Sequence, residues 1–373
     1  MKQKNPFLIS GYNSPDYFCD RKDDTERLLS AMENDRNVTL IAPRRYGKTG
    51  LIHHLFWNLP KDFKSVYLDI YGVRNLAEFA AAFASAVIGR LDSPSQKAFK
   101  RILSFFKSCR PTMTPQMDGS VKYSFDVAPS QAEATLQEAF EYLRKREVRA
   151  VIAIDEFQQV REFPEKGTEA ILRSYIQFVP WVRFIFSGSS QHLMREMFVS
   201  AQGPFYQSTE IMSLDVIPRA SYEPFARRLL NKGGIGLESD VFGELYRRFD
   251  GITWYLQAVL NKFWEFGENV ADVSSIDRAV EQLIVEREQV YQDLLRSQGE
   301  TQRAVLKAIA AAGVVAEPTS QEFVRTNRLS APSTVRSVLS GLKTRDLVFQ
   351  SASGWIVYDR LFGKWLKFEG LKV

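Results

Sequence analysis

The chain has little cysteine and little histidine, and it lacks any long apolar run. Its 373 residues include two cysteines, Cys19 and Cys109, and three histidines. Cysteines without a C-x-x-C pattern argue against a disulfide framework and a cysteine-based zinc site. No stretch approaches the roughly 18 apolar residues of a membrane span, and the apolar run 6–9 is too short for a signal-peptide core. We therefore expect a cytoplasmic protein without membrane contact.

The composition is that of a globular protein with an uneven charge. Hydrophobic residues make up 45% and charged residues 25%, which excludes bulk disorder. The net charge is +5, but residues 301–373 carry 11 Lys and Arg against 5 Asp and Glu, whereas the first 300 residues carry 38 against 39. This local surplus permits contact with nucleic acid or another anionic partner, and it also fits a solvated basic face.

Strands and helices alternate through the first two thirds of the chain. Short apolar runs predict strands at 38–42, 65–71, 149–155, 182–186 and, more weakly, 211–216. Amphipathic patterns predict helices at 24–34, 49–59, 76–91, 131–146 and 169–177. Strands separated by helices imply a parallel sheet covered on both faces, which is an α/β fold. Segment 113–127, with Asp118-Gly119 as its turn, predicts an inserted β-hairpin.

The remainder of the chain is mainly helical. Apolar spacing predicts helices at 221–231, 238–249, 253–266 and 275–295, followed by a linker at 296–301. Three further helices are then predicted at 302–312, 320–326 and 332–345, with strands at 347–351 and 354–357. That order is typical of a winged helix-turn-helix. We expect a core at 1–216, a helical lid at 217–297 and a winged helix at 298–373.

The strongest motif is Ala42-Pro43-Arg44-Arg45-Tyr46-Gly47-Lys48-Thr49. It fits the P-loop pattern G-x-x-x-x-G-K-[ST] with Ala for the first Gly, between a predicted strand and a predicted helix. Gly47 lets backbone N–H groups face phosphates, and the following helix adds its positive dipole end. Lys48 would reach the β- and γ-phosphates, and the Thr49 hydroxyl would bind Mg²⁺. The alternative is a Gly-Lys-Thr turn that opens an ordinary helix.

An acidic pair ends the predicted strand 149–155. The carboxyl end of a parallel strand is where ligands bind in such sheets. Asp155 would hold Mg²⁺ through water, and Glu156 would orient and polarise the attacking water. A purely structural pair is the alternative, but its position after Lys48, with one predicted strand between them, favours the catalytic interpretation.

Small hydroxyl residues follow the predicted strand 182–186. In P-loop ATPases with an inserted strand, a polar residue at this place senses the γ-phosphate. Ser187 and Ser189 are the candidates here. The alternative is a helix cap for the segment near Gln191.

These motifs together resemble the archaeal-type ATPase family, a branch of the signal-transducing (STAND) and AAA+ P-loop ATPases. The resemblance rests on 17–21, on the P-loop with its paired Arg, on 154–158 and on the near-terminal 358–366. It implies a five-stranded parallel sheet, a helical lid, a C-terminal winged helix, and ATP or ADP with Mg²⁺ as ligands. The nucleotide contacts that motif and resemblance predict are Phe18, Arg21, Pro43, Arg44, Arg45, Tyr46, Gly47, Lys48, Thr49 and Gly50.

Two positions depart from the family pattern. Many relatives carry Gly-Arg where this chain has Gln207-Ser208, and Thr253 replaces the Pro of the family's Gly-x-Pro-Tyr-Leu motif. The lid segment also has no Arg at that spot. Both changes weaken the case for an Arg contact to the γ-phosphate.

Three functions compete at this stage. The first is a slow Mg²⁺-dependent ATPase that acts as a conformational switch on an unidentified protein partner. The second is an ATP-regulated protein that binds double-stranded DNA through 331–345, where Arg336, Lys343 and Arg345 are the cations. The third is a protein-interaction platform. A nucleotide-dependent homo-oligomer fits each of them.

Overall fold

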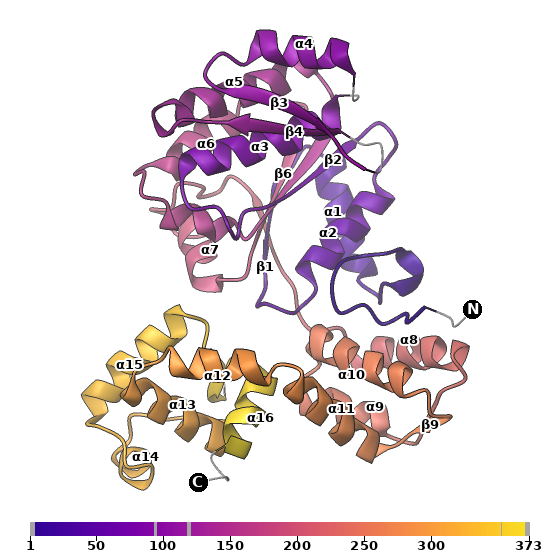
Figure 1. Cartoon of the computed structure of the whole chain (residues 1–373), viewed down its shortest axis with the longest axis vertical. Helices are drawn as coiled ribbons and strands as arrows, with labels where there is room; N and C mark the ends of the chain where they lie inside the picture. The colour runs from indigo at the N-terminus through magenta and orange to yellow at the C-terminus, as the bar shows by residue number, and fades with distance from the viewer. Residues whose placement is uncertain (1–3, 93–94, 118–120, 352, 370–373) are drawn as a thin grey trace. The chain divides into compact units, whose positions relative to one another are not determined.

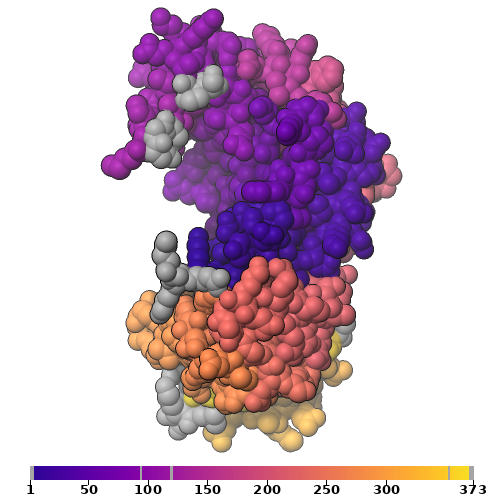
Figure 2. Space-filling view, turned by 90° about the vertical axis from the view of Figure 1, so that its right-hand side faces the viewer, coloured from indigo at the N-terminus to yellow at the C-terminus, as the bar shows by residue number. Residues whose placement is uncertain are grey.

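The computed structural model describes residues 4–92, 95–117, 121–351 and 353–369, and Figures 1 and 2 draw the others in grey. The described chain divides into two compact units. The first, here called the sheet unit, holds Leu8–Phe225 and Gly251–Tyr255. The second, the helical unit, holds Ala226–Asp250, the described residues after Tyr255 and a few at the N-terminus.

A parallel five-stranded sheet forms the centre of the sheet unit, as the sequence predicts. Its strand order is β2-β5-β6-β1-β7, and each neighbouring pair is parallel. Figure 1 labels β1, β2 and β6 of this sheet. The strands are β1 (Val38–Ile41), β2 (Lys64–Asp69), β5 (Ala150–Asp155), β6 (Val182–Gly188) and β7 (Glu210–Ser213). All six residues of β5 are buried, because a strand inside such a sheet is covered on both faces.

Helices pack on both faces of this sheet. On one face, α1 (Lys22–Glu33) and α2 (Lys48–Asn58) pack against Val151 and Ala153 of β5. On the other face, α3 (Leu76–Leu91), α5 (Ala132–Arg146), α6 (Thr168–Ile176) and α7 (Gln191–Phe198) share a core with Ile152 and Ile154. Alternate residues of β5 thus serve opposite cores, as the two-residue period of a strand requires.

The predicted hairpin is present but is longer than expected. Strands β3 (Arg110–Pro115) and β4 (Val121–Asp126) are antiparallel, and the predicted turn Asp118-Gly119 lies outside the described residues. Helix α4 (Gln96–Phe105), which the sequence analysis missed, precedes them. Its apolar residues do recur at helical spacing, and Ala98 and Ile102 are buried, so the local pattern was readable and was overlooked.

The helical unit begins within α8 (Arg219–Lys232) and continues with α9 (Val241–Arg248), most of α10 (Thr253–Phe266), α11 (Val273–Val285) and α12 (Glu288–Arg296). The prediction of one helix over 275–295 was wrong, because the chain turns at Arg287 (ψ 2°). There the Lys262 ammonium binds the Glu286 carboxylate at 2.6 Å. Two short parallel strands, β8 (Gly236–Leu237) and β9 (Val270–Ala271), were also missed.

The C-terminal part has the predicted order of helices and hairpin. It comprises α13 (Glu300–Ala312), α14 (Gln321–Thr326), α15 (Pro332–Thr344), β10 (Val348–Ser351), β11 (Gly354–Val357) and a further helix, α16 (Arg360–Glu369). Val335, Leu339 and Leu342 of α15 are buried, and Val338 beside them is partly buried. None of the described helices has the length and apolar character needed to cross a membrane.

Helix α16 ties this C-terminal part to the end of α9. The Arg360 guanidinium pairs with the Asp250 carboxylate at 2.5 Å. The Lys364 ammonium lies 5.8 Å from the centre of the Phe249 ring, and burial, together with the charge of Arg248, lowers the pKa of Lys364. The helices after α8 and the winged-helix elements therefore belong to one unit.

Candidate functional site

The loop between β1 and α2 has the geometry of a phosphate cradle. Gly47 has φ +93°, a left-handed conformation that glycine adopts without strain, and a Cβ there would meet no atom within 4 Å. Lys48 is 6% exposed, and its ammonium donates to the carbonyls of Ala42 at 2.8 Å and Pro43 at 3.2 Å. The first N–H groups of α2, which begins at Lys48, lack partners within the helix and can bind an anion.

The predicted metal-binding pair is assembled at the carboxyl edge of the sheet. Asp155 is 4% exposed, and its Oδ2 accepts a hydrogen bond from the Thr49 hydroxyl at 2.8 Å. The same oxygen accepts one from the Tyr67 hydroxyl, also at 2.8 Å. Burial and the Asp155 carboxylate raise the pKa of Tyr67, so the phenol keeps the proton that it donates. The sequence analysis did not identify Tyr67.

Glu156 lies beside Ser189, one of the two serines named in the sequence analysis. Its Oε2 accepts hydrogen bonds from the Ser189 hydroxyl at 2.6 Å and from the amide of Gln158. Glu156 has φ 55°. Residues other than glycine seldom adopt this conformation, and those that do are frequently found at functional sites. Gln158 is a second residue that the sequence analysis missed.

The paired arginines of the loop point to different partners. Arg44 donates from Nε to the Ser189 hydroxyl at 3.3 Å. The Arg45 guanidinium lies 4.7 Å from the centre of the Trp254 ring and 4.9 Å from that of Tyr255, and it donates to the Tyr255 hydroxyl. The Arg45 carbonyl accepts from the Trp254 N–H at 3.2 Å. Arg44 thus joins the hydrogen-bonded cluster that contains Ser189 and Glu156, whereas Arg45 holds the segment Gly251–Tyr255.

Two predicted nucleotide contacts brace the loop from the N-terminal side. Arg21 is 8% exposed and donates to the carbonyls of Tyr46 at 3.1 Å and Asp215 at 2.6 Å. The Phe18 ring stacks on His54 with centres 4.2 Å apart. A Cβ added to Gly50 would lie 3.4 Å from the Phe18 ring. Phe18 therefore packs on α2 directly beside the loop.

Burial lowers the pKa of His54, which leads to a test of this packing. The His54 imidazole binds a proton less readily in the folded protein than in the unfolded chain. The protein is therefore most stable, with respect to this group, well above the ordinary pKa of 6.5, and it loses stability as the pH falls through that value. We expect His54→Phe, which keeps a ring against Phe18, to reduce the loss of Tm between about pH 7.5 and pH 5.5. Thermal unfolding measures it, with exposed His192→Gln as the control, and an unchanged pH dependence would count against the assignment.

The residues of this site fit a nucleoside triphosphate with a divalent cation. The loop offers an open cradle at Gly47 and a buried ammonium, and Thr49 with Asp155 supplies the hydroxyl and carboxylate oxygens that Mg²⁺ prefers. Ser187 adds a fully buried hydroxyl without a hydrogen-bond partner in the described part of the chain. Such a group is costly unless a ligand satisfies it.

A parallel sheet with a phosphate-type loop after β1 and an acidic pair after β5 defines the class of P-loop NTPases. Residues 18–259 match the family described as an ATPase domain predominantly from Archaea, and the chain belongs to that family. Residues 289–368 match a probable winged helix domain. The protein is thus a nucleotide-binding ATPase-family member that carries a C-terminal winged helix.

Solved structures with low sequence identity share this fold. The Walker-type ATPase PABY2304 of Pyrococcus abyssi is 16% identical, with a TM-score of 0.69 over 97% of this chain and 99% of its own. The ORC2 protein of Aeropyrum pernix is 14% identical, with a TM-score of 0.59 over 100% and 99%. ORC1 of the same organism, solved in complex with DNA, is 14% identical, with 0.54 over 95% and 94%. No protein of curated function matches the chain significantly.

Proposed function

We propose that this protein is a slow, Mg²⁺-dependent ATPase that works as a nucleotide-driven switch on a protein partner. The observation that carries the proposal is the path of α10. Its first residues, Trp254 and Tyr255, are held by Arg45 of the phosphate-type loop, and from Leu256 onward the same helix belongs to the helical unit. A change at the loop can therefore reach that unit through one continuous helix.

The roles of the site residues follow from their chemistry. Lys48 and the N–H groups at the start of α2 bind the β- and γ-phosphates, and Thr49 and Asp155 hold Mg²⁺. Mg²⁺ held there would supply positive charge against the phosphate oxygens. Glu156 orients and polarises the attacking water, and Ser187 or Ser189 senses the γ-phosphate. Arg44, joined to Ser189, adds a positive charge to the same group.

Two features favour slow turnover. One oxygen of the Glu156 carboxylate accepts hydrogen bonds from both Ser189 and Gln158, so these bonds must rearrange before that oxygen engages water. The chain also has Gln207-Ser208 where many relatives carry Gly-Arg. A cation supplied by a neighbouring copy would speed hydrolysis, which fits a switch that waits for assembly or for a partner.

The helical unit responds as one body in this proposal. Arg360 of α16 pairs with Asp250, the residue before the segment Gly251–Tyr255. Lys364 of the same helix lies over Phe249. A rotation of α10 would therefore carry the winged helix together with the helices that precede it.

Trp254→Ala is expected to uncouple the helical unit from the nucleotide. The substitution removes one cation–π contact of Arg45, worth about 0.5–2 kcal/mol, and leaves the phosphate-binding residues in place. Hydrogen exchange in residues 256–369 should differ between ATP and ADP in the unaltered protein, and this difference should shrink in the variant. ATP affinity should stay within about threefold, as for the control Trp181→Ala, which changes an exposed ring. A difference as large as in the unaltered protein would exclude this coupling route.

A second candidate is ATP-regulated binding of double-stranded DNA through residues 331–345. The winged helix and the likeness to an ORC1 structure that contains DNA favour it. Arg336 and Lys343 are exposed on α15, while Arg345 lies past its end and donates to the Gln298 amide oxygen at 3.0 Å. The other outward side chains are Ser333, Thr334, Ser337, Ser340 and Thr344. Because these are uncharged, we favour a protein partner.

Fluorescence anisotropy with duplex DNA at two salt concentrations distinguishes the two candidates. If α15 binds DNA, the log–log salt slope should be about −0.9 for each neutralised phosphate, hence roughly −3 for three cations. Arg336→Glu with Lys343→Glu should then abolish binding without unfolding, because neither side chain is buried. The control reverses exposed Lys61 and Lys166. Absence of binding at low salt with both ATP and ADP would remove the DNA hypothesis.

A further inference from the structure

Strand β2 forms an open edge of the central sheet. Among the described strands it pairs with β5 alone. The N–H of Lys64 donates to the carbonyl of Arg149, and the N–H of Ile70 donates to the backbone carbonyl of Asp155. Because successive backbone groups of a strand point to opposite sides, the N–H and C=O of Ser65 and Tyr67 face away from β5. These groups are a template for another strand.

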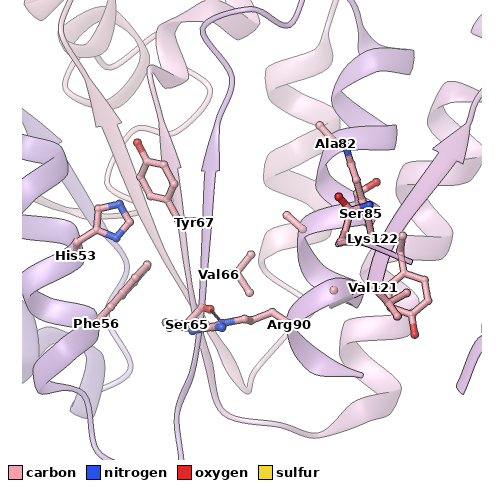
Figure 3. Close-up of a pocket in the computed structure, with 14 residues that line it drawn as sticks. His53, Phe56, Ser65, Val66, Tyr67, Ala82, Ser85, Arg90, Val121 and Lys122 are labelled. Carbon is pink, nitrogen blue, oxygen red and sulfur yellow. Dashed lines mark hydrogen bonds between the residues drawn. The ribbon is translucent and has the colours of Figure 1, made fainter. Parts of the chain in front are cut away.

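A groove of about 630 Å³ follows this edge. Figure 3 draws the residues that line it. Ser65, Val66 and Tyr67 form its floor. His53 and Phe56 of α2 lie on one side of the strand, and α3 with β4 lies on the other (Figure 3). Four of the five α3 residues that line the groove are small, which leaves room for a main chain, and they are Ala82, Ser85, Ala86 and Gly89.

The charged side chains among the described residues of the groove are of one sign. Arg90 and Lys122 are exposed cations that line it, and none of the 14 described lining residues carries a carboxylate. Arg90 lies across the edge and donates from Nε to the Ser65 carbonyl at 2.9 Å. A charged side chain placed there protects an open edge from unwanted pairing. An acidic ligand would draw the guanidinium away and expose that carbonyl.

We propose that this groove binds an extended, acidic segment of a partner protein, which adds to β2 as a further strand. Main-chain hydrogen bonds to Ser65 and Tyr67 would supply affinity, as in other cases of strand addition. Arg90 and Lys122 would select for Asp or Glu in the segment.

The floor of the groove connects directly to the site described above. Tyr67 lines the groove and donates its hydroxyl to Asp155. A strand bonded to the backbone of Tyr67 therefore restrains a residue that positions Asp155. This coupling rests on the proposed ATPase function, whereas the binding itself does not.

Selection of random 12-residue peptides on the immobilised full chain, without nucleotide, tests the binding. We expect enriched peptides to alternate apolar residues with Asp or Glu. Fluorescence anisotropy with the most enriched peptide then gives its affinity. Gly89→Trp should weaken binding at least tenfold, because a side chain there enters the groove and its Cβ meets no atom within 4 Å. Gly341→Trp, at a helical glycine of α15 with equal space, is the matched control.

Charge reversal provides an independent variant. Arg90→Glu with Lys122→Glu should abolish binding of the acidic peptide, and both residues are exposed, so the fold should persist. The proposal would be overturned if basic or uncharged peptides were enriched, or if no peptide were enriched. It would also be overturned if the acidic peptide bound the Gly89→Trp variant as tightly as the unaltered protein. If the chain associates with itself and Gly89→Trp abolishes this association, the groove binds a second copy of the chain. That result would also overturn the proposal.

The coupling has its own readout. The acidic peptide should change the rate of ATP hydrolysis by the unaltered protein. The peptide should bind the Tyr67→Phe variant as tightly as the unaltered protein. The variant should, however, hydrolyse ATP at the same rate with and without the peptide. An equal change of rate in both proteins would overturn the coupling through Tyr67. If the protein binds the peptide but hydrolyses no ATP, the proposed ATPase function is refuted. The assignment of the groove to an acidic segment would still stand.

Discussion

Lys48→Ala is expected to weaken ATP binding by about 100-fold or more. The buried Lys48 directly follows Gly47 of the loop, and its ammonium donates to the carbonyls of Ala42 and Pro43 at the start of that loop. A hydrogen bond to a charged group is worth about 1.5–3 kcal/mol, and Lys48 would make such bonds to the β- and γ-phosphates. Each loss of about 1.4 kcal/mol costs a factor of ten in affinity.

Isothermal titration calorimetry with ATP and Mg²⁺ measures the effect. Lys61→Ala is the matched control, because this exposed lysine follows α2 and no role is assigned to it. Thermal unfolding of both variants checks that the loop change has not unfolded the sheet unit. If Lys48→Ala binds ATP as tightly as the unaltered protein, the P-loop interpretation fails.

Glu156→Gln should leave ATP binding intact and lower the rate of hydrolysis by about 100-fold or more, the usual contribution of a positioned base. The amide keeps the shape of the side chain and can still accept hydrogen bonds from Ser189 and Gln158. It loses the negative charge that polarises water. The variant therefore separates binding from chemistry.

Phosphate release under saturating ATP measures this separation. Glu162→Gln is a suitable control, because it changes an exposed glutamate nearby in the sequence. The affinity for ATP should match that of the unaltered protein within about threefold. Hydrolysis at the unaltered rate would show that Glu156 has no catalytic role.

Much of the fold follows from local patterns in the sequence. The strands of the central sheet are apolar runs, and the helices around them repeat apolar residues at helical spacing, so both are recognisable without tertiary context. Helix α4 was overlooked although Ala98, Phe99 and Ile102 follow helical spacing. The break at Arg287 was missed because the contact between Lys262 and Glu286 depends on helix packing, not on local sequence.

The candidate site shows the same division. The phosphate-type loop and the acidic pair are contiguous motifs, so their chemistry is readable from spacing alone. Tyr67 reaches Asp155 because β2 pairs with β5 in a register that sets Asp69 beside Asp155, and no local pattern specifies that register. The contacts of Arg45 with Trp254 and Tyr255 join segments about 200 residues apart.

In the proposed switch, the nucleotide state moves the helical unit relative to the sheet unit. The most direct measurement is the distance between spin labels at Lys61→Cys in the sheet unit and Glu322→Cys in the helical unit, both exposed positions, with Cys109→Ser to remove the half-buried thiol. In the Glu156→Gln background, which should retain ATP, the account predicts different distance distributions with ATP and with ADP. Superimposable distributions under saturating ATP and ADP would contradict it.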